Sequence, residues 1–553
     1  MSDNQASEKR MPAYLKDLRP DPRAGREIDF QSPGERAPAV EAKFNRRRWI
    51  GLSVGILLAL IIYFIMPAEV PHNAKLTAAT AVLMGAWWMT EAIPLPATAL
   101  MPLILFPTLG EEIPIKDVGG AYGSDVIFLF MGGFLLALAM QRWNLHRRIA
   151  LLVVRAMGPK PGGMIAGFMI ATGFLSMWVS NTATAVMMLP IGISVLILVA
   201  KLTTGKDSAQ LAAAEAAASA AAQAEADEDG QTKVSAVEAV TKSNFGTALM
   251  LGIAYAASVG SLGTLIGTPP NTLLAGYMAE SHGVEIGFGQ WMLVGVPLAV
   301  VMTFAVWLLL TKALFKPEIK EIPGGRELMT EELAKLGPMS TGEKMVGAIF
   351  VFAALAWVFV PVFWKGLISD AGIAMVVGFL LFVLPAGANR GVRLLDWDSA
   401  VKLPWGVLLL FGGGLALSAQ FSGSGLTEWI GESVSGLAGI PILVMVALFA
   451  TGILFLTELT SNTATAATFL PVAGGVALGI GVDPMLLAIP VALAATCAFM
   501  LPVATPPNAI AYGSGYITIG QMVRGGLWLN LIGIVLVTMV TMTLAVWVFG
   551  LVL

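Results

Sequence analysis

One hexapeptide occurs twice in this chain, and its side chains are of the kinds that bind ions and small anions. Residues 180–185, Ser-Asn-Thr-Ala-Thr-Ala, return unchanged as residues 461–466, which sets an offset of 281 positions. At the same offset Ser176 maps onto Thr457. Both copies lie inside long apolar stretches, where polar side chains are costly unless something requires them. The agreement of the neighbours indicates an internal duplication with a paired polar centre.

A second pair of motifs interrupts two other apolar stretches. Residues 263–271 read Gly-Thr-Leu-Ile-Gly-Thr-Pro-Pro-Asn, and residues 505–508 read Thr-Pro-Pro-Asn. Proline lacks an N–H donor and disfavours helix in the residue before it, so each motif predicts a broken helix. A break frees carbonyl oxygens that can coordinate a hard alkali cation, and it exposes a helix N-terminus that favours an anion. A cation and an anion in one site is the chemistry of an ion-coupled symporter.

The elements that position these motifs must lie in a membrane. Of 553 residues, 56% are hydrophobic and only 12% are charged, against roughly 25% charged in a typical soluble domain. Several stretches exceed the ~18–20 apolar residues that span a bilayer, so the sequence predicts an all-α polytopic membrane protein with about 11 transmembrane segments. The single cysteine, Cys497, excludes disulfides within the chain, and the three histidines are too widely separated to favour a metal site. No Walker loop, dinucleotide fingerprint or HExxH motif points to an enzyme.

Composition divides the chain into a tail, a transporter domain and an insertion. Residues 1–46 are polar and Pro-rich and are expected to form a disordered cytoplasmic tail without a cleavable signal. Residues 47–553 are expected to form the transporter domain, in which residues 203–244 read as an Ala-rich, acidic cytoplasmic insertion. Three arginines at 46–48 precede the first span, so the N-terminus is expected in the cytoplasm. The number of crossings then leaves the C-terminus outside.

The two hexapeptides are expected at the tips of re-entrant hairpins. The first copy lies in residues 164–200, about 37 residues, which is too few for two comfortable spans. With the second hairpin at about 441–480, the predicted topology makes the two hairpins enter the membrane from opposite faces. This is an inverted-topology repeat with two hairpins and two broken helices, its first copy at about 126–278 and its second at about 405–513. Such repeats place a binding site near the midplane of the bilayer.

Each polar feature also has a purely structural interpretation. A single Ser-Asn-Thr in a helix commonly makes interhelical hydrogen bonds, and a single Thr-Pro-Pro-Asn is commonly a turn. Their presence in both halves favours a site. Glu91 and Glu458 are intramembrane carboxylates by position, and Glu458 adjoins the second tip, where it could tune cation affinity. Glu91 is better interpreted as a partner of the turn at 93–96, and His146 as an interfacial anchor.

Three kinds of motif follow one another along the chain. The run Trp-Trp-Met-Thr-Glu-Ala-Ile-Pro-Leu-Pro at 87–96 comes first, the two Ser-Asn-Thr copies follow, and Ala-Phe-Met-Leu-Pro-Val-Ala-Thr-Pro-Pro-Asn at 498–508 comes last. Together they resemble the divalent anion/sodium symporter family, the sodium-coupled di- and tricarboxylate transporters. The resemblance runs from about Trp49 to Leu553 and leaves out the tail and the insertion. One departure is Thr-Cys at 496–497, where the family usually has Ser followed by an apolar residue; the hydroxyl is kept.

The resemblance implies two sodium sites and one substrate site. The first sodium site would consist of Ser176, Ser180, Asn181 and Gly267, and the second of Thr457, Thr460, Asn462 and Ala504. The substrate carboxylates would lie between the tips, at Ser180, Asn181, Thr182, Ser461, Asn462, Thr463, Thr505 and Pro506. The family further implies a homodimer, in which a mobile transport subdomain moves against a scaffold as an elevator.

The residues and the resemblance together predict a sodium-coupled importer of C4-dicarboxylates such as succinate, malate or fumarate, in a bacterial inner membrane. Its expected partners are the dicarboxylate, Na⁺ as coupling ion and the lipid bilayer, with no organic cofactor and no nucleic acid. A dicarboxylate exchanger, and a sodium-coupled tricarboxylate or sulfate transporter, stay open as alternatives. The substrate class is open because the motifs contain no arginine or lysine that reads carboxylate geometry. An intramembrane enzyme would need a nucleophile–base pair or a metal set, and a receptor would need a sensing domain.

Overall fold

The computed structural model describes residues 42–552, apart from 205–242 and positions 323, 365, 388–390, 435, 437 and 438. The chain divides into two compact units, residues 1–49 and 50–553. The described part of the first unit is the start of helix α3 (Ala42–Ile65), which begins inside the range expected for the tail. The rest of that tail, and nearly all of the expected insertion at 203–244, lie outside the described residues.

Every named element of the described residues is a helix. In the first part of the chain these are α4 (His72–Thr90), α5 (Leu95–Thr98), α6 (Met101–Leu109), α7 (Ile115–Gly120), η1 (Ala121–Gly123), α8 (Asp125–Arg142), α9 (Leu145–Ala156), α10 (Pro161–Ser176), α11 (Asn181–Thr204), α14 (Asn244–Ser261), α15 (Pro269–His282), α16 (Phe288–Leu308) and the π-helical η2 (Leu309–Leu314). There follow α17 (Gly325–Lys335), α18 (Thr341–Phe363), α19 (Asp370–Val383), α20 (Trp397–Ala400), α21 (Trp405–Gly423), α22 (Leu426–Val434), α23 (Ile442–Thr457), α24 (Asn462–Gly479), α25 (Met485–Thr496), η4 (Pro502–Ala504), α26 (Pro506–Gly513), α27 (Ile519–Val540), the π-helical η5 (Thr541–Ala545) and α28 (Val546–Phe549).

Among the described residues, seven helices are long and apolar enough to cross a membrane. They lie at Asn45–Ile65, Ile115–Arg142, Asn181–Val199, Phe288–Leu314, Thr341–Phe363, Trp405–Gly423 and Ile519–Phe549. Shorter apolar helices, α10 and α23 among them, accompany these seven. The chain is therefore a multi-pass helical membrane protein, as the sequence predicts. α10 and α23 have 16 residues each, fewer than the ~20 that a full span requires.

The helix bounds follow the internal duplication far beyond the hexapeptides. α9, α10 and α11 begin at residues 145, 161 and 181, and α22, α23 and α24 begin at 426, 442 and 462, at the offset of 281 in each case. α15 and α26 each begin at the first proline of a Thr-Pro-Pro-Asn motif. α16 and α27 form a further pair, because each continues into a π-helical turn at its C-terminal end. The matched helices therefore extend past residue 513, where the sequence analysis ended the second repeat.

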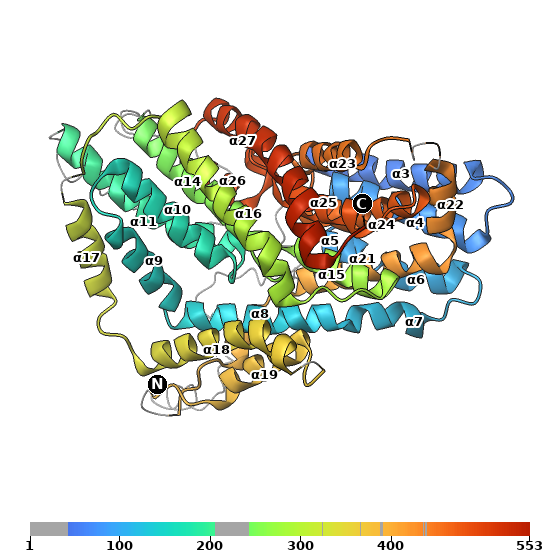
Figure 1. Ribbon diagram of the computed structural model, residues 1–553, viewed down its shortest axis with the longest axis horizontal. Helices are drawn as coiled ribbons and strands as arrows, with labels where there is room; N and C mark the ends of the chain where they lie inside the picture. The colour runs from blue at the N-terminus through green and yellow to red at the C-terminus, as the bar shows by residue number, and fades with distance from the viewer. Residues whose placement is uncertain are drawn as a thin grey trace, which may run out of the picture. The chain divides into compact units, whose positions relative to one another are not determined.

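Each hairpin packs on the broken helix of its own half. α10 and α11 pack against α14, as Figure 1 shows, and α23 and α24 pack against α25. The contact between α10 and α14 is backbone to backbone, because a Cβ on Gly260 would lie 2.2 Å from the carbonyl oxygen of Gly173. Small residues at such a crossing allow the close approach on which helix packing in membranes depends. The hairpins are thereby held against the breaks that they are expected to serve.

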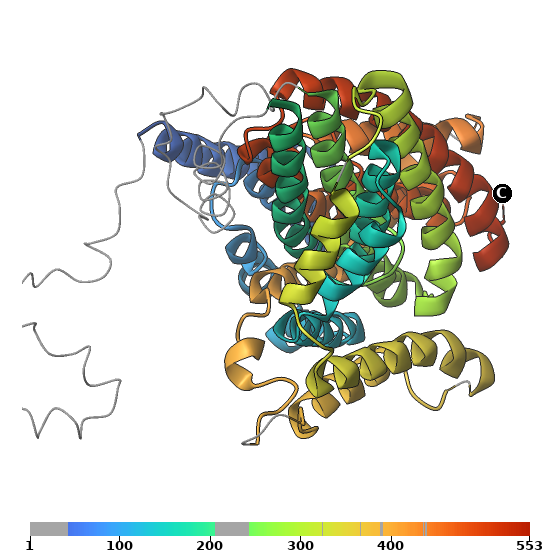
Figure 2. The same cartoon turned by 90° about the vertical axis from the view of Figure 1, so that its left-hand side faces the viewer.

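A charged cluster ties α9 to the segment that leads into α18. Arg148 binds the carboxylate of Glu343 through Nε and Nη2, and its Nη2 also donates to the carbonyl oxygen of Gly337 at 3.0 Å. Arg147 Nη2 lies 2.9 Å from Glu332 Oε2 on α17, which packs along α9 (Figure 2). Glu343 and Glu332 are both buried. A buried carboxylate needs such a partner, so these arginines join α9 to the α17–α18 connection.

A second ion pair lies at the connection between α19 and α20. Arg142, at the end of α8, pairs with Asp396, and Asp396 Oδ1 accepts the backbone N–H of Ser399 at 2.9 Å. The hydrogen bonds from Ser399 and Arg142 lower the pKa of the Asp396 carboxyl to about 2. The pair is largely exposed to solvent, so it fixes the start of α20 more than it adds to stability.

Candidate cation and anion site

Both Ser-Asn-Thr motifs form a short turn between two helices. α10 ends at Ser176 and α11 begins at Asn181, while α23 ends at Thr457 and α24 begins at Asn462. In each tip the Ser, Asn and Thr side chains are half-buried, whereas the hydroxyl residue that ends the preceding helix is fully buried. Each hairpin therefore combines an accessible polar tip with a buried oxygen four residues earlier.

The buried hydroxyl of each hairpin donates to a carbonyl near the C-terminal end of the broken helix in its own half. Ser176 Oγ donates to the carbonyl oxygen of Ala257 at 2.5 Å, and Thr457 Oγ1 donates to that of Ala495 at 2.9 Å. The carbonyl of Ala495 is among the last four of α25, which lack helical partners and carry partial negative charge, whereas that of Ala257 lies one residue before the last four of α14. A hydroxyl that donates its hydrogen keeps its lone pairs for a cation. The two expected ligands thus occupy matching positions in the two halves.

Each Thr-Pro-Pro-Asn motif shapes its break through its asparagine. Nδ2 of Asn271 and Nδ2 of Asn508 each donate to two carbonyl oxygens of the preceding segment, at 2.9–3.2 Å; these belong to Leu262 and Thr264 in the first half and to Ala498 and Leu501 in the second. Both asparagines are fully buried, and neither Oδ1 atom has a hydrogen-bond partner among the described residues. Each asparagine therefore holds the irregular backbone of its break through Nδ2, while its Oδ1 stays without a hydrogen bond among the described residues.

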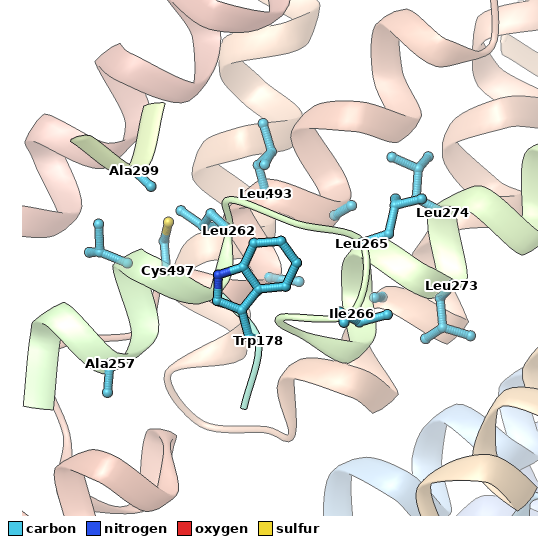
Figure 3. Packing of buried hydrophobic residues seen from close by; sticks show 14 of the residues in the cluster. Trp178, Ala257, Leu262, Leu265, Ile266, Leu273, Leu274, Ala299, Leu493 and Cys497 are labelled. Atoms are coloured by element: carbon cyan, nitrogen blue, oxygen red, sulfur yellow. The ribbon is translucent and has the colours of Figure 1, made fainter. Parts of the chain in front are cut away.

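The two halves meet at the breaks. Thr268 Oγ1 lies 3.4 Å from Thr496 Oγ1, so the start of α15 touches the end of α25. α11 also packs against α26, and α24 packs against α15. Each hairpin therefore contacts the broken helices of both halves. Figure 3 shows the same meeting in the apolar surroundings, where Cys497 of the second half lies beside Leu262 of the first.

Helix ends of both polarities gather at these breaks. α11, α15, α24 and α26 begin there, and α10, α14, α23 and α25 end there. The first N–H groups of α11 and α24 favour an anion, and free carbonyls at the four ends favour a cation. α15 and α26 each begin with two prolines, which have no N–H, so they offer an anion fewer donors. At the second tip Ser461 makes no side-chain cap, so the first N–H groups of α24 keep their capacity for an anion. At the first tip Ser180 Oγ accepts the N–H of Ala183 at 3.3 Å.

The asparagines of the two tips are held differently. Asn462 Oδ1 accepts from Thr457 Oγ1 at 2.8 Å, so two expected ligands of the second sodium site lie together. Asn181 Oδ1 accepts the backbone N–H of its neighbour Thr182 at 2.8 Å. Thr460, a further expected ligand, is buried and makes a 2.7 Å hydroxyl contact with Thr465. Two expected ligands of the second sodium site are therefore hydrogen-bonded to each other, whereas Asn181 of the first site bonds to the backbone of its neighbour.

The remaining expected ligands lie in the breaks themselves. Gly267 and Ala504 are both buried, each shortly before the threonine that begins the next helix. A Cβ on Gly267 would lie 2.2 Å from the carbonyl oxygen of Ser261, which requires glycine there. Thr505 is buried as the N-cap of α26, and its Oγ1 accepts the N–H of Asn508, whereas Pro506 is exposed.

Glu458 is a carboxylate at the end of α23 with only 3% of its surface exposed. Its oxygens accept the N–H groups of residues 499–501 at 2.7–3.2 Å and Nδ2 of Asn530, on α27, at 2.7 Å. All of these partners are donors, which is the arrangement that an ionised carboxylate requires. The sequence analysis identified Glu458 as a functional candidate, and the structure supplies its partners.

Three residues of the site were missed by the sequence analysis. Thr268 begins α15 as Thr505 begins α26, and the shared motif could have identified it. Thr496 was noted only as a departure, yet its hydroxyl contacts the other half. Asn530 is a buried polar residue in the otherwise apolar stretch 525–537 of α27, and such residues mark functional positions in membrane proteins.

Comparison with known proteins identifies the family of the chain and its relatives. A family model described as the sodium:sulfate symporter transmembrane region matches residues 46–551. The chain is 41% identical over 514 residues to the sodium-dependent dicarboxylate transporter SdcS of Staphylococcus saprophyticus, which covers 92% of this chain and 93% of that protein. It is also 41% identical over 504 residues to SdcS of Staphylococcus aureus (strain USA300), covering 90% and 91% respectively.

Two solved structures resemble the chain in fold. The YdaH transporter of Alcanivorax borkumensis matches with a TM-score of 0.51 and 14% identity, covering 87% of this chain and 99% of that one. MtrF of Neisseria gonorrhoeae matches with a TM-score of 0.51 and 12% identity, covering 92% and 96%. At these identities the likeness concerns the arrangement of helices alone.

Proposed function

Because the chain belongs to the sodium:sulfate symporter family, we propose that it is a sodium-coupled importer of C4-dicarboxylates. The observation that carries the proposal is the twofold pairing of a Ser-Asn-Thr tip with a broken helix through a buried hydroxyl, Ser176 in one half and Thr457 in the other. The relatives that are 41% identical are named sodium-dependent dicarboxylate transporters, which favours dicarboxylate over the sulfate of the family description.

The two sodium ions are assigned to the two buried hydroxyls and the oxygens around them. The first ion would bind Ser176, Ser180, Asn181 and Gly267, and the second Thr457, Thr460, Asn462 and Ala504. Side-chain and carbonyl oxygens of this kind suit a hard cation. The 2.8 Å contact between Thr457 and Asn462 supports the second assignment, since it places two ligands within reach of one ion.

The dicarboxylate is assigned to the half-buried tips. Its contacts would be Ser180, Asn181, Thr182, Ser461, Asn462, Thr463, Thr505 and Pro506. Neither tip contains arginine or lysine, so hydroxyl, amide and helix N-terminal donors must bind the carboxylates. Such donors leave much of the anion's charge uncompensated, and adjoining sodium ions would supply the missing positive charge. This dependence is the physical basis that we infer for coupling.

The architecture is inferred to be an inverted repeat, with the two hairpins entering the membrane from opposite faces. The 16-residue length of α10 and α23 supports re-entrant hairpins rather than full spans. On the family's pattern the protein would be a homodimer of the bacterial plasma membrane, with a cytoplasmic N-terminus and an external C-terminus. The hairpins and broken helices would move together as an elevator against the remaining helices.

Uptake of labelled succinate by proteoliposomes tests the proposal. Uptake that requires an inward sodium gradient is expected. Counterflow that ignores the gradient would make the protein an exchanger. A competition panel of succinate, citrate and sulfate then identifies the substrate, and stronger competition by citrate or sulfate would replace the dicarboxylate assignment.

A further inference from the structure

α16 in the first half and α27 in the second contact the break of their own half in the same way. In the first half, a Cβ on Gly295 of α16 would lie 2.4 Å from the carbonyl oxygen of Leu262, which also accepts Nε1 of Trp291 at 3.1 Å. In the second half, a Cβ on Gly526 of α27 would lie 2.3 Å from the carbonyl oxygen of Phe499. The two glycines lie seven residues after the start of their helices, so the contacts are equivalent.

Two positions around these equivalent contacts differ in chemistry. Met177 occupies the place of Glu458 at the offset of 281, and Ala299 occupies the place of Asn530 when α16 is aligned with α27. Met177 contributes its backbone carbonyl, which accepts from Thr264 Oγ1. The second half therefore has a carboxylate and an amide where the first half has a thioether and a methyl group. The duplication is symmetric in shape and asymmetric in charge.

The Glu458 carboxylate holds the segment that leads to the second sodium site. The peptide unit between Ala498 and Phe499 is fixed at both ends, because its N–H binds Glu458 and its carbonyl accepts from Asn508. A planar peptide unit held at both ends has a fixed orientation. The following N–H groups also bind Glu458, and the segment ends at Ala504, an assigned ligand of the second ion.

We propose that Glu458 is a positioning residue for the second sodium site, and that its charge makes this site the tighter of the two. The inference rests on the proposed sodium-coupled function. Glu458 directly follows Thr457, and its side chain binds the N–H groups of residues 499–501 in the segment that ends at Ala504, so the carboxylate is linked to both arms of the site. A buried negative charge attracts a nearby cation strongly because little water screens it. At the matching position the first site has only Met177.

Glu458→Gln tests the proposal, because the change keeps the size of the side chain and removes its charge. The sodium dependence of succinate uptake is measured with the full chain in proteoliposomes, and sodium-induced protection against heat is measured in detergent without substrate. Loss of the charge should weaken one ion site roughly tenfold. Because two ions must bind, the half-saturating sodium concentration should rise about threefold while maximal uptake is kept. Protection by sodium should need correspondingly more sodium.

Two control variants separate charge from packing. Met177→Gln introduces the same amide at the equivalent position of the first half without removing a charge, and should leave the sodium dependence unaltered. Asn530→Ala removes one hydrogen bond from Glu458 but keeps its charge, so it should raise half-saturation less than Glu458→Gln does. A Glu458→Gln protein that folds and shows the half-saturation of the unmodified chain would overturn the proposal and leave Glu458 a purely structural residue.

Two further outcomes are also decisive. If Glu458→Gln does not fold, Glu458→Asp, which keeps the charge, replaces it: sodium dependence close to that of the unmodified chain supports the role of charge, and a folded Asp variant without sodium dependence overturns it. Sodium-independent uptake by the unmodified chain would instead refute the proposed function itself. The two failures are thus distinguishable.

Discussion

Replacing Thr457 by valine tests the second sodium site at Oγ1, the hydroxyl oxygen that contacts both Asn462 and Ala495. The change removes Oγ1 and alters the shape of the side chain little. The hydroxyl has one hydrogen, which Asn462 Oδ1 and the carbonyl oxygen of Ala495 share at 2.8 and 2.9 Å. The lost hydrogen bonds lower the stability of the fold, whereas the ion itself loses one oxygen ligand, a polar contact to a charge worth about 1.5–2 kcal/mol. Since about 1.4 kcal/mol is tenfold in affinity, the second ion should bind roughly ten- to thirtyfold more weakly.

The assay is succinate uptake by proteoliposomes as a function of external sodium. When two ions are required, the half-saturating concentration follows the square root of a change at one site, so it should rise about three- to fivefold. Thr451→Val is the matched control. Thr451 lies on the same helix and donates to the carbonyl oxygen of Ala447 at 2.7 Å, a bond within α23 that serves no break. Its loss should leave sodium activation unchanged.

The comparison between the two valine variants decides the outcome. Equal sodium half-saturation in Thr457→Val and Thr451→Val would refute the assignment of Thr457 as a ligand. A drop in maximal uptake without a change in half-saturation would likewise place Thr457 in the packing of the hairpin and outside the ion site. Membrane yield of both variants is measured first, so that a folding defect is not scored as weak sodium binding.

Three further predictions concern the framework. Gly526→Ala puts a Cβ 2.3 Å from the carbonyl oxygen of Phe499 and should lower folded yield in size-exclusion chromatography, whereas Gly520→Ala in the same helix meets nothing within 4 Å and should not. Arg148→Ala leaves its buried carboxylate partner unpaired and should destabilise the protein by about 3–5 kcal/mol, seen as a lower midpoint of thermal unfolding; an unchanged midpoint would show that this cluster contributes nothing. The lowered pKa of Asp396 means that its stabilisation is present above the ordinary value of 3.8 and is lost as pH falls toward about 2. Asp396→Asn should therefore reduce slightly the acid sensitivity of the midpoint, and equal acid sensitivity in both proteins would contradict this.

The ends of the functional helices could be predicted because particular residues mark them. Proline lacks the N–H that the interior of a helix requires but is favourable at the first position of a helix. α15 and α26 accordingly begin at Pro269 and Pro506. The hexapeptides are expected at the tips of hairpins, and α11 and α24 begin at the asparagine of each copy. Local chemistry sufficed in these cases, since the residues that set the boundary are neighbours in the chain.

The partners at the site could not be predicted, because they come from distant helices. Asn530 reaches Glu458 across 72 positions, and the sequence gives no sign of that contact. Identical hexapeptides also orient their asparagines differently, since Asn462 finds the hydroxyl of Thr457 whereas Asn181 binds the backbone of its neighbour. A motif specifies which groups are present, and tertiary packing decides which of them meet.

Cys497, the single cysteine of the chain, has a practical consequence for measuring movement. It is fully buried beside the first half's Leu262, so water-soluble thiol reagents have little access to it in the folded protein. Cysteines introduced at exposed positions, such as Val503 before α26 and Leu367 between α18 and α19, would then carry spin or fluorescent labels with little background. The distance between these two labels, with and without sodium, would report directly whether the breaks travel relative to the outer helices. The wild-type chain is already close to the cysteine-free background that such spectroscopy requires.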